Sequence, residues 1–275
     1  YSDASSTGYG GYMVEHGMHV ANGVWLPDEA KQSSTWRELV AVKRVLHAVA
    51  DKLKCSHIRW FTDNQNVVRI LTVGSGKCCL QDVALQIFAL CMSHAIHIQP
   101  EWVPREQNEI ADYISRIVDY DDWYVNPAVF AWVDELWGPH TVDRFASHYN
   151  RQLPRFNSRF TCPGGEAVDA FTVNWCSENN WWCPPPVLIL KVLRHAEWCK
   201  ASGTLVVPCW ESAPYWPLLC PRGEGFATFV VDYLPLPMEV ETFCPGRSGV
   251  VLFNGRTPNS AVFALRLDFS GDLKC

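Results

Sequence analysis

Four acidic residues in the first 112 positions have the types and the spacing to bind metal ions together. They are Asp3, Glu38, Asp63 and Asp112, separated by 35, 25 and 49 residues. Carboxylates that converge repel one another unless cations neutralise them, and hard oxygen ligands favour Mg²⁺ or Mn²⁺. A pair of such ions can hydrolyse phosphodiester bonds. If the fold brings these side chains together, the sequence predicts a two-metal phosphodiesterase site.

The elements around these acids place each of them near a predicted strand end or helix start. Glycines punctuate residues 1–26, which are rich in Tyr, Val and Trp and predict a β meander. An apolar stripe from Leu39 to Leu53 recurs at helical spacing. The elements expected after it are a strand over residues 57–62, helices over 65–71 and 80–95, a strand over 96–103 and a helix from residue 108.

Each acid also has an explanation that needs no metal. The pair Thr35 and Glu38 fits a capping box at a helix start. Asp63 could cap the helix that follows it, and Asp112 lies near a first turn, where the helix dipole favours negative charge. Asp3 could hold the turn after it. The order of the four acids on successive elements, rather than any single acid, therefore carries the prediction.

That order of acids, carried on a first strand, a first long helix, a fourth strand and a last helix, resembles type 1 ribonuclease H. The resemblance covers about residues 1–118 and implies an α/β fold, a mixed five-stranded sheet with helices. The flanking sequences that share the resemblance are Ser2-Asp3-Ala4-Ser5, Thr62-Asp63-Asn64-Gln65 and Asn108-Glu109-Ile110-Ala111-Asp112.

The resemblance implies an enzyme that hydrolyses the RNA strand of RNA–DNA hybrids with two Mg²⁺ or Mn²⁺ ions. Asp3 would bridge the two ions, Glu38 and Asp63 would complete one coordination sphere, and Asp112 the other. Backbone groups near Gly8–Gly11, with the side chains of Asn64 and Gln65, are candidates for contacts with the 2′-hydroxyls of RNA. The loop over residues 104–107 lacks the His of cellular relatives, which bears on product release and rate rather than on the chemistry.

The second half of the chain predicts a separate α/β domain. Residues 118–125 are acidic and aromatic and predict a linker, so we expect domains over residues 1–120 and 121–275. Asn126, Pro127 and Gly138 are typical of a helix start and a helix end. Further along, we expect a helix over residues 187–198 and a strand over 204–207, an order that indicates an α/β layer.

Three motifs stand out in this half: Asp143-Arg144-Phe145-Ala146-Ser147, Val168-Asp169-Ala170-Phe171 and Trp182-Cys183-Pro184-Pro185. They resemble the region of DIRS-like (tyrosine-recombinase) retrotransposon polyproteins that is similar to phage-type DNA adenine methyltransferases. The resemblance spans about residues 126–220 and implies a Rossmann-like domain with an upstream reverse transcriptase in the same polyprotein. The weak cofactor-binding positions that it implies are Asp143, Asp169, Pro184 and Pro185.

The second resemblance departs from the methyltransferase pattern where methyl transfer needs it. Cys183 and Pro186 stand where that pattern has Asn or Asp and an aromatic residue. Cys is a poor hydrogen-bond acceptor, and Pro cannot stack on a base. A glycine-rich loop for S-adenosylmethionine is also missing, so we expect a degenerate domain that does not bind this cofactor. The alternatives are an active adenine methyltransferase, an inert nucleic-acid or protein-binding module, and an unrelated α/β accessory domain.

Composition bounds the remaining possibilities. The 275 residues carry 23 Lys and Arg against 29 Asp and Glu, a net charge of −6, whereas nucleic-acid binders are usually basic. Bound divalent cations would reverse that sign locally. None of the 12 cysteines forms a Cys-x-x-Cys pair, which argues against a zinc module. Reduced thiols in an intracellular protein, in the cytoplasm or nucleus, are favoured over a disulfide framework.

Membrane and targeting signals are not evident in the sequence. No apolar run reaches the ~18–20 residues of a membrane span. The N-terminus has no signal-peptide pattern. It also has no initiating Met, so we expect this chain to be part of a longer polypeptide.

Overall fold

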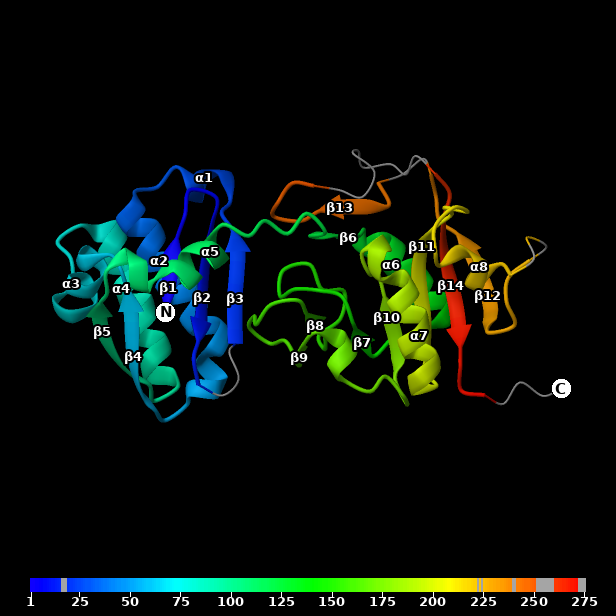
Figure 1. Ribbon diagram of the computed structural model, residues 1–275, viewed down its shortest axis with the longest axis horizontal. Coiled ribbons are helices and arrows are strands. Elements are labelled where there is room, and N and C mark those ends of the chain that lie inside the picture. The colour runs from blue at the N-terminus through cyan, green and yellow to red at the C-terminus, as the bar shows by residue number, and fades with distance from the viewer. Residues whose placement is uncertain (16–18, 222, 224, 239–240, 251–259, 272–275) are drawn as a thin grey trace. The chain divides into compact units, whose positions relative to one another are not determined.

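The computed structural model describes residues 1–15, 19–221, 223, 225–238, 241–250 and 260–271 (Figure 1). The chain divides into two compact units. The first unit comprises Tyr1–Asp119 with Phe160–Pro163, and the second comprises Tyr120–Arg159 with Gly164–Cys275. Among the described helices, none has both the length and the apolar character that a membrane span requires.

The first unit confirms the expected order of strands and helices and adds three short helices. Its antiparallel meander is followed by a long helix, a strand, further helices, a second strand that pairs in parallel with the first, and a last helix. Its strands are β1 (Ser2–Ala4), β2 (Gly8–Met13), β3 (His19–Val24), β4 (His57–Thr62) and β5 (His97–Trp102). Its helices are α1 (Pro27–Ala30), α2 (Ser34–Val49), α3 (Gln65–Val73), α4 (Cys78–Ser93) and α5 (Glu109–Ser115), with 3₁₀ turns η1 (Ala50–Leu53) and η2 (Arg105–Gln107).

Instead of the expected single five-stranded sheet, the described residues of this unit form two separately hydrogen-bonded sheets. β1, β2 and β3 form an antiparallel sheet, and β4 and β5 form a parallel pair. β1 is only three residues long and offers little ladder to a second neighbour. A buried side-chain hydrogen bond joins the pieces instead, because Trp60 Nε1 donates to Ser2 Oγ over 2.9 Å.

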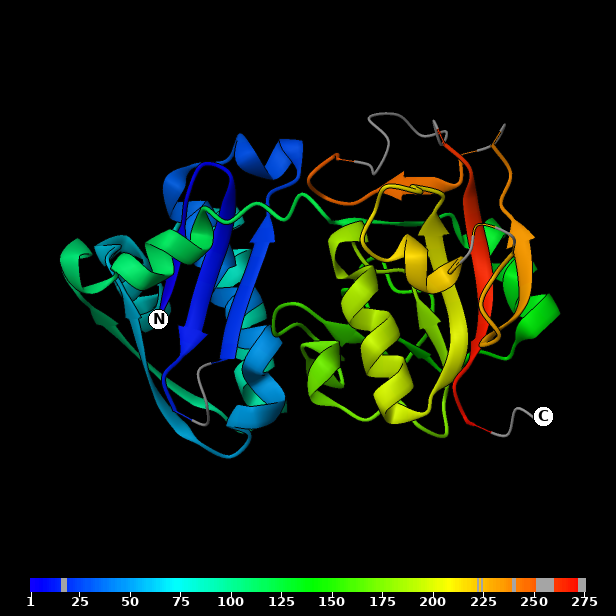
Figure 2. The same ribbon diagram turned by 45° about the vertical axis from the view of Figure 1, so that its right-hand side comes forward.

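Helices cover both faces of the antiparallel sheet. Successive residues of β2 point to opposite sides, so each face packs against different helices. Tyr9 belongs to the large core cluster that α2 and α4 build, and a Cβ on Gly11 would meet Val45 of α2. Tyr12 packs instead with Ala111 and Ile114 of α5. Figure 1 and Figure 2 show α2 and α5 beside these strands. The helices that carry Glu38 and Asp112 are therefore fixed against one sheet.

The contact between β2 and α5 leaves no room for a side chain at Gly10. A Cβ atom there would lie 2.3 Å from the Ser115 nitrogen and 2.5 Å from the Ile114 carbonyl carbon. We expect Gly10→Ala to lower the free energy of unfolding by about 1–3 kcal/mol, because the backbone of α5 must move. Urea denaturation measures this loss.

The matched control for this change is Gly76→Ala. A Cβ atom on Gly76 meets no atom within 4 Å. This variant is expected to stay within about 0.5 kcal/mol of the parent chain. Equal losses at the two positions would contradict the close packing of α5 on β2.

The second unit is built on a mixed five-stranded sheet. Its order is β12-β14-β11-β10-β7, in which β7, β10 and β11 are parallel and β14 pairs antiparallel with both β11 and β12. The sheet strands are β7 (Val142–Asp143), β10 (Asn179–Trp182), β11 (Ser202–Pro208), β12 (Val230–Pro235) and β14 (Val262–Asp268). The other elements are β6 (Trp123–Val125), α6 (Pro127–Trp137), β8 (Asn157–Ser158), β9 (Ala167–Val168), η3 (Ala170–Thr172), η4 (Pro186–Leu188), α7 (Ile189–Cys199), α8 (Trp216–Leu219) and β13 (Phe243–Pro245).

Two helices cover opposite faces of this sheet. Trp182 packs in the cluster that contains α7, whereas its neighbour Trp181 packs in the cluster that contains α6. The punctuation of α6 is as predicted, since Asn126 Oδ1 accepts from the Ala128 nitrogen and Gly138 follows the last helical residue. The predicted helix and strand of this half are confirmed as α7 and β11, within two residues at each end.

Candidate metal centre

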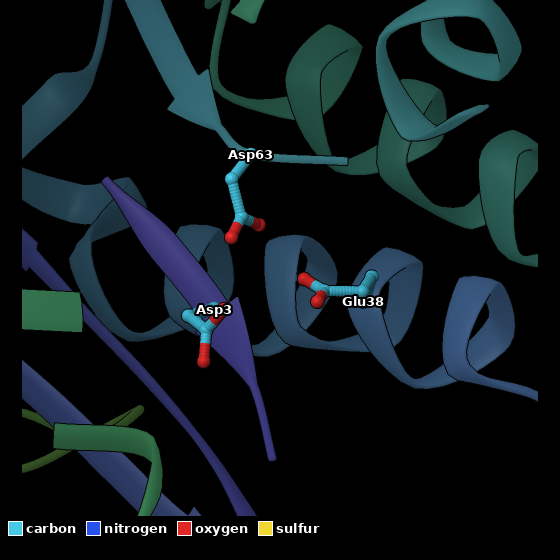
Figure 3. Close-up of side chains that lie close together, drawn as sticks. All are labelled: Asp3, Glu38 and Asp63. Atoms are coloured by element: carbon cyan, nitrogen blue, oxygen red, sulfur yellow. The ribbon is translucent and has the colours of Figure 1, made fainter. Parts of the chain in front are cut away.

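Three of the four acids meet at one edge of the first unit. Asp3 lies in β1, Glu38 in the second turn of α2, and Asp63 directly after β4. One ligand oxygen from each lies within 4.8 Å of those of the other two. Figure 3 shows the three carboxyl groups directed toward a shared space. Strand, helix and strand end thus supply one oxygen-ligand cluster from positions far apart in the sequence.

The capping explanations for two of these acids are wrong. The N-cap of α2 is Ser33, whose hydroxyl accepts from the Trp36 nitrogen over 3.3 Å, so Glu38 is too far along the helix to complete a capping box. Asn64, not Asp63, caps α3, because its Oδ1 accepts from the nitrogens of Asn66 and Val67. The carboxylates of Glu38 and Asp63 are left to the cluster.

Burial makes this cluster costly without a cation. Asp3 is only 5% exposed and Glu38 7%. Burial, with the nearby charges of Asp3 and Asp63, raises the pKa of Glu38 to about 9. Burial likewise raises the pKa of Asp3 and of Asp63. The cluster therefore holds protons, or a cation in their place.

One atom of the cluster lacks a partner. Glu38 Oε2 is buried and accepts no hydrogen bond. Buried polar atoms are almost always satisfied, and an exception calls for an explanation such as an ion. Three carboxylates with an orphaned oxygen fit one divalent cation, whose hard oxygen ligands are of this kind.

Asp112 lies close to the cluster but is paired with two arginines. Its Oδ1 accepts from Arg116 Nη2 over 2.6 Å and from Arg105 Nη2 over 3.2 Å, and its Oδ2 accepts from Arg116 Nε over 3.0 Å. The Arg116 hydrogen bonds hold the pKa of Asp112 below its usual range. The charge of Asp112 still raises the pKa of Asp3 and of Asp63. The predicted convergence of four acids is thus three acids together and a fourth beside them.

Two further residues position the cluster: Ser115, which the sequence reasoning missed, and Asn108, which it gave only as a flanking residue of the Asp112 motif. Ser115 is fully buried, and its hydroxyl lies 2.8 Å from both Asp3 Oδ2 and the Asp112 carbonyl oxygen. Asn108, also fully buried, donates from Nδ2 to the Ser2 carbonyl oxygen over 3.1 Å. The available signal was the spacing of Asp112 and Ser115, three apart on one helix and so on one face.

We expect Ser115→Ala to weaken Mn²⁺ binding by about tenfold, the effect typical of a hydrogen bond that orients a metal ligand. The Ser115 hydrogen bond lowers the pKa of Asp3, so its loss favours a proton on Asp3 over a cation. Calorimetric titration of Mn²⁺ at fixed pH measures the change. The control is Ser93→Ala, since the exposed Ser93 hydroxyl contacts the Leu90 carbonyl oxygen and His94 Nδ1 and none of the acids. Unchanged affinity in Ser115→Ala would exclude this positioning role.

The remaining predictions for the first unit concern contacts with nucleic acid. Gly8–Gly11 are buried, with α2 and α5 packed against the strand, so the predicted contact of nearby backbone groups with nucleic acid is restricted here and stays a prediction. Gln65 is exposed beside Asp63, and Asn64 is half-buried with its oxygen used as a cap. These two side chains stay candidate substrate contacts.

In the second unit, three of the weak cofactor positions lie at or after the ends of two neighbouring parallel strands. Asp143, at the end of β7, is buried and accepts from the Gln152 nitrogen over 3.0 Å, and burial raises its pKa to about 6. Pro184 is buried and Pro185 half-buried after β10. Asp169 instead caps the turn at η3 by accepting from the Phe171 nitrogen.

Comparisons with known proteins found one matching family model and similar solved structures. Among solved structures, the chain is similar to RNase H1 from the archaeon Halobacterium salinarum, with 18% identity and a TM-score of 0.33 over 42% of this chain and 89% of that one. It is also similar to the N-terminal RNase H domain of a Mycobacterium tuberculosis protein, with 19% identity and a TM-score of 0.30 over 42% and 85%. No curated protein matches the chain. Residues 5–118, which include Glu38, Asp63 and Asp112, match the family model described as Reverse transcriptase-like.

Proposed function

We propose that the first unit is a divalent-cation-dependent nuclease that hydrolyses the RNA strand of RNA–DNA hybrids. The observation that supports this most is the cluster of Asp3, Glu38 and Asp63, which have ligand oxygens within 4.8 Å of one another and of which Asp3 and Glu38 are buried. The Reverse transcriptase-like match over residues 5–118 and the ordered acid pattern support the choice of substrate. A reverse transcriptase leaves its RNA template paired with new DNA, and this activity would remove it.

In this proposal Asp3, Glu38 and Asp63 hold Mg²⁺ or Mn²⁺. When bound, the cation activates a water as nucleophile and neutralises negative charge that develops around phosphorus. The chain's own residues supply the geometry: Ser115 orients Asp3, and Trp102 Nε1 donates to the Asp63 carbonyl oxygen over 3.0 Å. Because the acids have raised pKa values, they give up protons as the cation binds, which couples binding to pH.

For the second unit we propose a methyltransferase-like scaffold that does not transfer methyl groups. Its support is the parallel order of β7, β10 and β11, with Asp143 at the end of β7 and Cys183 directly after β10. Burial raises the pKa of the Cys183 thiol, so it stays protonated and a weak acceptor. We further propose that the chain acts inside the cell, next to an upstream reverse transcriptase of a DIRS-like retrotransposon polyprotein. Binding of S-adenosylmethionine in a calorimetric titration would contradict the inert scaffold.

The experiment for the first unit is a cleavage assay with the purified chain. The substrates are an end-labelled RNA–DNA hybrid, the same sequence as a DNA duplex, and the free RNA strand. We expect cleavage of the RNA strand of the hybrid alone, in Mg²⁺ or Mn²⁺ and not with a chelator. The Asp63→Asn variant, which loses one ligand charge, serves as the inactive control.

Two outcomes would contradict the proposed function. One is cleavage by Asp63→Asn at the rate of the parent chain, which would point to a contaminating nuclease. The other is a hybrid left intact at every cation concentration although the chain binds Mn²⁺. Equal cleavage of free RNA would keep the chemistry and reject the hybrid as the specific substrate.

A further inference from the structure

The ion pairs around Asp112 distinguish this acid from the other three. Both of its carboxylate oxygens are engaged: Oδ1 by Arg105 and Arg116, and Oδ2 by Arg116. Glu38, by contrast, keeps a buried oxygen with no partner. The chain thus offers one set of oxygens ready for a cation and one oxygen pair already occupied by guanidinium groups.

Occupied oxygens are poor ligands for a second cation. Two guanidinium groups place two positive charges against one carboxylate, so an approaching divalent cation meets net repulsion as well as blocked lone pairs. A second ion at Asp112 therefore requires the arginines to move. As the residues stand, they fit one cation at the cluster and do not fit a second.

The arginines are free to move outward. The Arg105 side chain is 67% exposed and that of Arg116 54%, against 26% for Asp112. Exposed ion pairs contribute only ~0–1 kcal/mol each, so a competing anion can displace them. An open hollow of the surface is lined by Arg105, Glu106, Glu109 and Asp112. It gives an incoming group access to the ion pair between Arg105 and Asp112.

A phosphate group is the anion best matched to these side chains. Arginine binds phosphate through two parallel hydrogen bonds, in the same geometry that Arg116 uses on Asp112. A nucleic-acid backbone presents such phosphates in series. When it does, the guanidinium groups exchange one acidic partner for another, and Asp112 is left beside the cluster without them.

We propose that Arg105 and Arg116 form a latch that keeps Asp112 from binding a cation until a backbone phosphate takes over the two guanidinium groups. The inference rests on the proposed function, because it takes Asp3, Glu38 and Asp63 as cation ligands and a nucleic acid as substrate. Both arginines are positioning residues in this scheme. The latch delays the complete site until substrate is present.

The first test counts Mn²⁺ ions on the full chain without substrate, by calorimetric titration and electron paramagnetic resonance. We expect one strong site in the parent chain. Arg116→Gln should gain a second site, or bind it at least about tenfold more tightly, a change typical of residues next to metal ligands. Arg116→Lys, which keeps the charge but loses the two-pronged contact, should fall between. Two equal sites in the parent chain, or an unchanged second site in Arg116→Gln, would overturn the latch.

The matched control is Arg59→Gln. It removes the same charge from the same unit, where Arg59 pairs with Glu101 through two hydrogen bonds. It should bind Mn²⁺ like the parent chain, and a second site there would show general electrostatics rather than a latch. If Arg116→Gln fails to fold by circular dichroism, Arg105→Gln carries the same test, with a smaller effect because Arg105 makes one hydrogen bond to Asp112.

The second test follows the arginines themselves by nuclear magnetic resonance of their Nε–H groups in cation-free protein. Inorganic phosphate is the probe. It should shift the Arg116 signal, assigned through Arg116→Lys, at a lower phosphate concentration than the Arg59 signal. No shift at Arg116 would overturn the role of phosphate. Neither test measures cleavage, so failure of the latch and failure of the nuclease function are separate results.

Discussion

Replacing Glu38 with Gln is expected to abolish cation-dependent cleavage and, at the same time, to stabilise the chain in the absence of cations. Cleavage should fall by at least about 10³-fold, or about 4 kcal/mol of transition-state stabilisation. The loss follows because Gln offers a neutral amide where the cluster needs a charged oxygen. The same change removes a buried carboxyl group whose pKa is raised to about 9. Stability and activity therefore change in opposite directions at one residue.

The measurements are single-turnover cleavage of the hybrid and urea denaturation with a chelator, both at pH 8. We expect the free energy of unfolding to rise by at least about 1 kcal/mol, since Gln folds without having to take up a proton. The control is Glu101→Gln, which removes a carboxylate that pairs with the exposed Arg59 side chain in the same unit. It should leave cleavage unchanged. A Glu38→Gln chain that is both inactive and less stable would argue for a purely structural role of Glu38.

The stability of the cation-free chain is expected to decrease as pH rises from about 4 to 9. An unfolded Glu has a pKa of about 4.3, whereas burial first, and then Asp3 and Asp63, raise the pKa of folded Glu38 to about 9. Between these values the folded chain holds a proton that the unfolded chain has lost. The contribution of Glu38 is thus fully present below the lower pKa and is lost as pH rises through the upper one. The slope is at most about 1.4 kcal/mol per pH unit for this proton.

Saturating Mg²⁺ should counter this loss because the ion takes the place of the proton. The stabilisation by Mg²⁺ is expected to be small near pH 5 and to grow toward pH 9. Thermal denaturation at five pH values, with Mg²⁺ and with a chelator, gives both curves. Glu38→Gln should flatten the chelator curve. A Mg²⁺ effect that is independent of pH would mean that the ion binds away from these acids.

The sequence predicted the helices and strands better than the long-range contacts between them. Periodicity in α2 and the Asn126, Pro127 and Gly138 punctuation of α6 are local signals, and both were confirmed. The pairing of β1 with β4 is not local, and there the expected continuous sheet is replaced by a hydrogen bond between Trp60 and Ser2. Side-chain joins of this kind leave no periodic trace in a sequence.

The acidic residues of the candidate site could be predicted from the sequence, but the residues that pair with them could not. The order of the four acids indicated which residues to consider, but Asp112 proved to be paired with arginines. Arg116 could have been anticipated, because an acid four residues before a basic residue pairs along a helix. Arg105 reaches Asp112 across a turn of the 3₁₀ segment, which spacing alone does not reveal. The methyltransferase-like interpretation of the second unit stays a prediction.

The hydrogen bond between Ser115 and Asp3 also determines when the site can form. It joins residues 112 positions apart, and the cluster beside it depends on α5 closing over β2. Contacts of such long range form late in folding, because loop closure must come first. A ribosome makes the first hairpin long before it makes α5. The growing chain therefore carries Asp3, Glu38 and Asp63 through synthesis without the helix whose Ser115 orients Asp3, and the cation site is complete only once residue 115 has emerged.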